Sequence, residues 1–162
     1  NTPAAHKMDQ PVYIPVTAEE AGLFKSDDGL VSAKIFAGEV LGTKGKVKAL
    51  SPVNAATFDV KKGGKISIPL PADHNAFIYL LDGVIKLEGY GLVEGKNAVV
   101  FKKDGDSIAF EATENTRILF MTGKPLDEKV VSYGPFVMNS QTQIMEAMRD
   151  YQIGKMGVLI EA

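Results

Sequence analysis

The stretch from Ala76 to Glu88 reads AFIYLLDGVIKLE, and its pattern indicates β-structure. Its two apolar runs, 76–81 and 84–88, have the length and the β-branched and aromatic content of strands. Only Asp82 and Gly83 separate them, and this pair is typical of a tight hairpin turn whose two central residues adopt positive φ. We therefore expect the two runs to form antiparallel strands that pair with each other.

Similar short runs continue on both sides of this stretch. They cover residues 31–37, 56–60 and 65–70 before it, and 98–101, 107–111 and 117–122 after it. Turn residues separate the runs at fairly even spacing, which is typical of a β-sandwich or barrel. The sequence therefore predicts an all-β domain.

The segment 1–29 has a different character. It contains many residues that break regular structure, namely Pro3, Pro11, Pro15, Gly22 and the turn sequence Asp27-Asp28-Gly29. We expect 1–29 to be an arm or linker and 30–162 to be the domain. Because the chain opens on Asn1 rather than Met, we also expect that an upstream segment was removed by processing, trimming or proteolysis.

One segment near the C-terminus has a helical period. Ser140 followed by Gln143 resembles a capping box, and Gly154 stands where a helix would end. The pattern predicts a single helix over 142–153 with an apolar stripe at Ile144, Ala147, Met148 and Tyr151. This stripe packs either on the domain's own sheet or on a missing domain or partner.

Composition limits the possible functions. The chain has 162 residues, of which 45% are hydrophobic, enough for the core of one domain. Its 18 Lys and Arg against 20 Asp and Glu give no long-range attraction toward nucleic acid. No apolar run approaches the length of a membrane span. The absence of cysteine excludes disulfides and thiolate sites and favours a reducing compartment, cytoplasmic or, in a eukaryote, also nuclear.

Few residues are candidates for chemistry. The only histidines are His6, in the arm, and His74, so the chain cannot supply a three-histidine metal site. Asp73 and His74 precede the run 76–81, and they would point to opposite faces of a strand. No nucleophile or acid–base pair stands out beside them, and the glycines form no phosphate loop. We expect no catalytic, cofactor-binding or metal-binding residue in this chain.

An unusual segment connects the last predicted strand to the helix. It is Tyr133, Gly134, Pro135, Phe136, Val137, Met138 and Asn139. Gly134-Pro135 interrupts regular structure and is followed by apolar side chains in extended backbone. We expect this segment to be a strap that holds the helix in place or faces another domain.

These motifs together resemble the pirin family. The signature consists of Gly123-Lys124-Pro125-Leu126, the run 133–139, Asp150-Tyr151-Gln152, Gly154 and Gly157. The opening Asn1-Thr2-Pro3-Ala4 resembles the linker between the two cupin domains of that family, and Ala37-Gly38-Glu39 resembles the start of its second domain. The resemblance implies a cupin-type double-stranded β-helix, or jelly-roll barrel, with one C-terminal α-helix. It also implies that Asp73 and His74 lie at the pocket rim, where a cupin places its ligands.

The family resemblance further implies what a longer parent does. Pirins are bicupins whose metal, usually iron, is held by three histidines and a glutamate of the N-terminal domain, and several members are quercetin 2,3-dioxygenases. None of those metal motifs occurs here, so we expect the chain to be the metal-free C-terminal half of such a protein and not an enzyme alone. The alternative is a non-enzymatic binding or regulatory module for a protein partner or a small apolar ligand.

The resemblance also predicts partners. The first is the N-terminal cupin domain, which is missing from this chain. Where that domain would dock, we expect an exposed apolar patch that promotes self-association or binding of a protein partner. We expect neither nucleic acid nor a membrane to be a direct partner.

Overall fold

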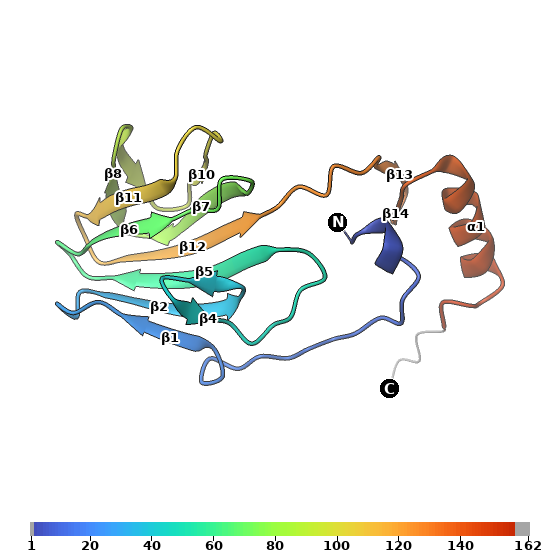
Figure 1. Ribbon diagram of the computed structural model, residues 1–162, viewed down its shortest axis with the longest axis horizontal. Coiled ribbons are helices and arrows are strands. Elements are labelled where there is room, and N and C mark those ends of the chain that lie inside the picture. Colours follow the sequence, from blue (N-terminus) through green and yellow to red (C-terminus); the bar gives the residue numbers. More distant parts are fainter. Residues whose placement is uncertain (1, 158–162) are drawn as a thin grey trace. The chain divides into compact units, whose positions relative to one another are not determined.

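The computed structural model describes residues 2–157, and its main body consists of two antiparallel β-sheets (Figure 1). Both sheets lie in one compact unit, Val12–Pro125. The six-stranded sheet has the order β1 (Gly22–Lys25), β2 (Val31–Ala37), β5 (Val53–Val60), β12 (Thr116–Gly123), β7 (Asn75–Asp82) and β10 (Ala98–Val100). The four-stranded sheet has the order β6 (Lys65–Pro69), β11 (Ser107–Ala112), β8 (Val84–Leu87) and β9 (Gly91–Glu94). The expected all-β fold is confirmed.

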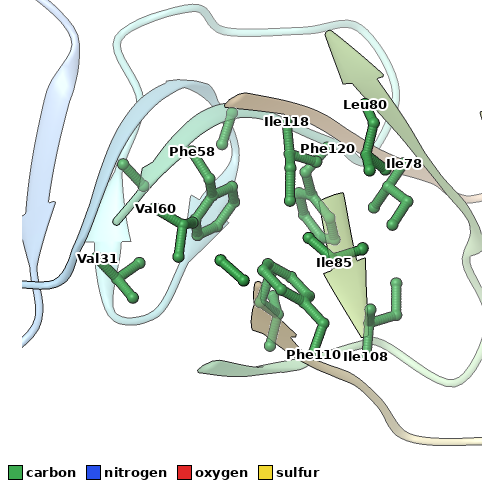
Figure 2. Close-up of a cluster of buried hydrophobic side chains, with 14 of the residues drawn as sticks. Val31, Phe58, Val60, Ile78, Leu80, Ile85, Ile108, Phe110, Ile118 and Phe120 are labelled. Carbon is green, nitrogen blue, oxygen red and sulfur yellow. The ribbon is translucent and has the colours of Figure 1, made fainter. Parts of the chain in front are cut away.

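The core lies between these two sheets. Alternate residues of each strand point inward, so that buried and less buried positions alternate along β2, β5, β11 and β12. Phe58 and Phe120 of the larger sheet meet edge to face at 5.9 Å between ring centroids. Figure 2 shows them opposite Phe110, which belongs to the smaller sheet. The two sheets therefore share one continuous apolar interior.

The predicted hairpin at Asp82-Gly83 is wrong, although both strands exist. β7 pairs with β12 and β10 of the larger sheet, whereas β8 pairs with β11 and β9 of the smaller one. Gly83 has a φ of 82°, but Asp82 does not have the positive φ that this hairpin turn requires. The chain instead passes from one sheet to the other here, and the Thr116 hydroxyl accepts a hydrogen bond from Val84 N at 3.1 Å.

This corner gives a test of why glycine occupies position 83. A Cβ at Gly83 would meet the Thr116 hydroxyl and the Asn115 carbonyl, whereas Gly63, with a φ of 83°, has open space around it. We expect Gly83→Ala to lower the free energy of unfolding by about 3 kcal/mol, from left-handed backbone strain plus overpacking. Gly63→Ala, which carries the strain alone, should cost about 1 kcal/mol. Urea denaturation measures the unfolding free energy of both variants. Equal losses would contradict the close approach of Gly83 to Thr116 and Asn115.

The predicted arm is shorter than expected. Gly22–Lys25 forms the edge strand β1, which pairs with Ser32–Ile35 of β2. Proline and glycine interrupt the local pattern, but the free edge of β2 supplies the hydrogen-bonding partner that the local sequence does not reveal. The short strands β3 (Glu39–Val40) and β4 (Thr43–Lys44) and the strand β9 were also not predicted.

A second compact unit contains the described residues on either side of Val12–Pro125, namely 2–11 and 126–157. It includes the 3₁₀ turn η1 (Ala4–His6), the hairpin of β13 (Val131–Tyr133) and β14 (Phe136–Met138), and α1 (Gln141–Gln152). The expected domain 30–162 therefore divides, because its C-terminal part associates with the N-terminal residues: Ala4 N donates to the Glu128 carboxylate at 2.8 Å.

The helix closely follows its prediction. α1 begins and ends one residue before the expected bounds, and Ser140 Oγ accepts the Gln143 amide at 3.3 Å as a cap. The Gln143 side chain accepts from Asn139 N rather than completing the box at Ser140. In the stripe, Ile144 and Ala147 are buried, whereas Tyr151 remains exposed. Within residues 2–157, no helix has the length and apolar character needed to cross a bilayer.

Candidate functional site: a polar cluster at one end of the barrel

Three polar side chains continue the inward-facing rows beyond the apolar core. Asn54 precedes the buried Ala56 by two positions on β5, and Thr122 follows the buried Phe120 by two on β12. His74 occupies the corresponding position before Ala76, just ahead of β7. Since β5, β12 and β7 are neighbours in the sheet, strand alternation gathers these three side chains at one end of the interior.

The Thr122 hydroxyl contacts both other members of the cluster. Its Oγ1 accepts a hydrogen bond from Asn54 Nδ2 at 3.0 Å and lies 3.0 Å from His74 Nδ1. Because the hydroxyl accepts from Asn54, it can donate its own proton to Nδ1 of a neutral His74. Asn54 Oδ1 in turn accepts from Glu39 N at 3.0 Å. The cluster therefore fastens the β3 turn to the end of the six-stranded sheet.

Glycine at position 38 makes this arrangement possible. Gly38 has a φ of 71°, and a Cβ there would collide with the Asn54 side-chain oxygen and the Val53 carbonyl. The backbone thus approaches Asn54 closely enough for the next residue to donate its amide proton.

The donor set does not fit a divalent metal. A cupin-type metal site needs several imidazoles and a carboxylate directed at one point, whereas this cluster offers one imidazole, one amide and one hydroxyl. Asn54 and Thr122 already use their polar atoms in the hydrogen bonds described. Within the described range 2–157, no three His, Asp or Glu side chains gather closely enough to hold an ion. His6 contacts Asp9 at 2.7 Å in the N-terminal segment and does not join the cluster.

Asp73 takes a separate role from its neighbour. Its carboxylate is exposed and lies 2.9 Å from the Lys124 ammonium, while His74 contacts Thr122. The hydrogen bond from Lys124 holds the pKa of the Asp73 carboxyl below its ordinary value, and the positive charge of Lys124 adds to this. The two residues proposed as a pocket rim therefore make different contacts and do not act on one point.

This ion pair predicts a titration. A lowered pKa in the folded chain means that the pair stabilises the fold above the unfolded pKa of Asp73 and loses that effect as the pH falls through the folded value. We expect Lys124→Met to raise the Asp73 pKa toward its ordinary value in a carboxyl-carbon NMR titration. Lys103→Met is the matched control, since Lys103 donates only to the Asp73 backbone carbonyl at 3.4 Å. If the Asp73 pKa is the same in Lys124→Met as in the original chain, the ion pair does not lower it.

The hydroxyl at the centre of the cluster can be tested with a near-isosteric change. Thr122→Val leaves Asn54 Nδ2 and His74 Nδ1 without their present partner, so we expect a loss of about 1–3 kcal/mol in unfolding free energy. The control is Thr57→Val on the outward side of β5, expected to change stability by less than about 0.5 kcal/mol. Chemical denaturation measures the unfolding free energy of both variants. Equal values would show that the cluster does not stabilise the fold.

The predicted strap residues lie in the second compact unit. Tyr133 and Phe136 flank the turn between β13 and β14, where Gly134 has a φ of 53°. The Phe136 ring meets Tyr151 of α1 edge to face at 6.2 Å between centroids. Asn139 Nδ2 donates to the Lys129 carbonyl at 2.9 Å and to the Glu128 carboxylate at 3.2 Å. The hairpin therefore contacts the helix, and Asn139 ties its end to the preceding segment.

Asn54 and Thr122 were not recognised from the sequence as site residues. Thr122 lies in a predicted strand and Asn54 just before one, each at a position that faces inward by strand alternation. A polar residue at an inward-facing position is the signal by which they could have been found. The bonding between them depends on strands far apart in the sequence and could not be read locally.

The comparisons agree with this architecture. Residues 55–157 match the family model described as the pirin C-terminal cupin domain. A pirin-like protein of Solanum lycopersicum is 33% identical, with 97% of this chain and 54% of that protein aligned. A putative quercetin 2,3-dioxygenase of Thermoplasma acidophilum is 29% identical, over 96% of this chain and 62% of that protein.

A solved structure gives the same result for the fold. The quercetin 2,3-dioxygenase of Acinetobacter baumannii superposes with a TM-score of 0.90 at 31% identity, covering 99% of this chain and 56% of that one. The match supports the cupin-type fold. The chain spans somewhat more than half the length of the curated relatives it matches.

Proposed function

The chain belongs to the pirin family, as its C-terminal cupin domain, and we propose that it is the metal-free half of a bicupin whose full-length form is an iron-dependent quercetin 2,3-dioxygenase. The similar proteins of Thermoplasma acidophilum and Acinetobacter baumannii are named quercetin 2,3-dioxygenase, the former as putative. In each, this chain corresponds to little more than half of the molecule, which leaves room for a second domain. In this proposal the chain contributes scaffold and an interdomain surface, and the preceding domain holds the iron.

The hydrogen-bonded cluster of Asn54, His74 and Thr122 carries this proposal. It occupies the end of the barrel interior, and its polar atoms bond to one another and to Glu39 N. An ion bound there would gain a single imidazole ligand from His74, and Asn54 and Thr122 would have to leave their present hydrogen bonds to become ligands. The iron of a full-length protein therefore belongs in the other domain, and the strap 133–139 is assigned a structural or interdomain role.

Metal content tests whether the iron is held by the preceding domain and not by this chain. We expect the purified chain to hold far less than one equivalent of iron, nickel or zinc by elemental analysis. The longer protein, expressed with its upstream sequence, should hold about one equivalent and consume oxygen with quercetin. His74→Ala in the longer protein should leave its metal content unchanged.

Two outcomes would contradict the proposal. One is an equivalent of metal in the purified chain that His74→Ala removes, because this would place the site in the present barrel. The other is a longer protein that lacks bound metal and leaves quercetin unoxidised.

A binding module remains the second candidate, and one feature favours it. The second compact unit contains a hollow of 720 Å³ between residues 7–11 and α1. Met8, Met138 and Met156 line it, and methionine side chains adapt to varied apolar surfaces. A longer protein that does not oxidise quercetin but retains a ligand through this hollow would favour the module.

A further inference from the structure

The four-stranded sheet has an outer face on which the side chains form two distinct rows. On β6, β11, β8 and β9 (Figure 1), alternate residues are buried against the core, so the residues between them point away from it. The first row crosses all four strands through directly paired positions and consists of Lys65, Glu111, Lys86 and Leu92. The second row lies two residues away on the same strands and consists of Ser67, Ala109 and Glu88.

The second row leaves a hollow in this face. Ser67 and Ala109 have short side chains, and a hollow of 470 Å³ lies over them. The charged side chains that border it come from both rows and are Lys65, Glu111, Lys86 and Glu88. Because two lysines and two glutamates balance, this face has no net charge that would attract a strongly acidic or strongly basic partner.

The charges of the two rows complement each other when the face meets a copy of itself. Consider a two-fold axis that lies in the plane of the face and runs across the strands, between the two rows. The strands of the two copies are then antiparallel, and the first row of each copy lies over the second row of the other. Lys86 therefore faces Glu88 of the second copy, and symmetry repeats this pair at an equal distance on the other side of the axis.

The sizes of the side chains are complementary in the same arrangement. Lys65 lies over Ser67 of the second copy, and Glu111 lies over Ala109. Lys65 and Glu111 already pair with each other at 3.3 Å, so they enter the hollow as a neutral pair. Long side chains of each copy thus fill the space that short side chains leave in the other.

We propose that the outer face of the four-stranded sheet joins two copies of this chain about such a two-fold axis. A different protein would have to carry the same two rows, whereas a second copy supplies both of them by symmetry. The face lies entirely within the unit Val12–Pro125. The inference goes beyond the proposed function and needs neither a metal nor a substrate.

The extent of the face limits the strength of this association. Four strands about 4.8 Å apart, each contributing about five residues of about 3.3 Å, give a flat area of about 300 Å² per copy. Stable interfaces bury about 800 Å² per partner. We therefore expect a weak dimer with a dissociation constant on the order of 100 μM.

Reversal of single charges tests the pairing of Lys86 with Glu88. Sedimentation equilibrium of the chain between about 10 μM and 1 mM gives the dissociation constant. Lys86→Glu and Glu88→Lys each turn two attractive contacts into repulsive ones, so we expect either variant to weaken association about tenfold or more. Both side chains are exposed, which leaves the core unaffected.

A mixture of the two variants separates pairing from any other effect of the substitutions. In a heterodimer of Lys86→Glu with Glu88→Lys, every facing pair again has opposite charges. We expect the equimolar mixture to associate as strongly as the original chain, within about twofold. Lys102→Glu is the matched control, because it makes the same change in net charge at an exposed position in the loop after β10 and should leave association unchanged.

Three results would overturn the inference. A chain that remains monomeric at 1 mM would exclude the dimer, on the order-of-magnitude scale expected for so small a face. Association that neither reversal weakens would assign self-association to another surface. Weakened variants whose mixture does not recover would show that the two charges do not face each other across an interface. Each of these results would leave the metal content and the activity of the longer protein, and so the proposed function, unaffected.

Discussion

The strands of two sheets must together enclose one apolar interior. Each strand must direct every second side chain inward, and Phe58, Phe120 and Phe110 fill the middle of the enclosed space. A pair of aromatic rings such as Phe58 and Phe120 adds about 0.5–1.5 kcal/mol to the burial of its apolar area. Once these rings fix the register of the sheets, the side chains at the end of each row have little freedom of placement.

The polar cluster follows from that constraint. Asn54, His74 and Thr122 stand at the ends of inward rows, where the interior meets solvent, and buried polar atoms there must find partners. They find them in one another and in the Glu39 amide. These hydrogen bonds close this end of the barrel interior.

Much of the fold could be predicted from local pattern. The runs 31–37 and 107–111, the helix near 142–153 and its Ser140 cap all depend on neighbours within a few residues, and all are present. The pairing at Asp82-Gly83 could not be predicted. In a hairpin, Leu80 and Ile85 would face the same side, and they also share one core when β7 and β8 lie in different sheets. The hydrophobic pattern is identical in both arrangements, so only long-range pairing with β12 and β11 separates them.

The amino-acid composition limits the chemistry available to this chain. With His6 and His74 as its only imidazoles, it cannot supply a three-histidine site. How the available residues combine depended on the tertiary structure. It brought the Thr122 hydroxyl within hydrogen-bonding distance of both His74 and Asn54, placed Asp73 beside Lys124, and set Phe77 opposite Met121 on neighbouring strands. Residue type is a property of one position, whereas hydrogen bonding and surface continuity depend on strands that meet only after folding.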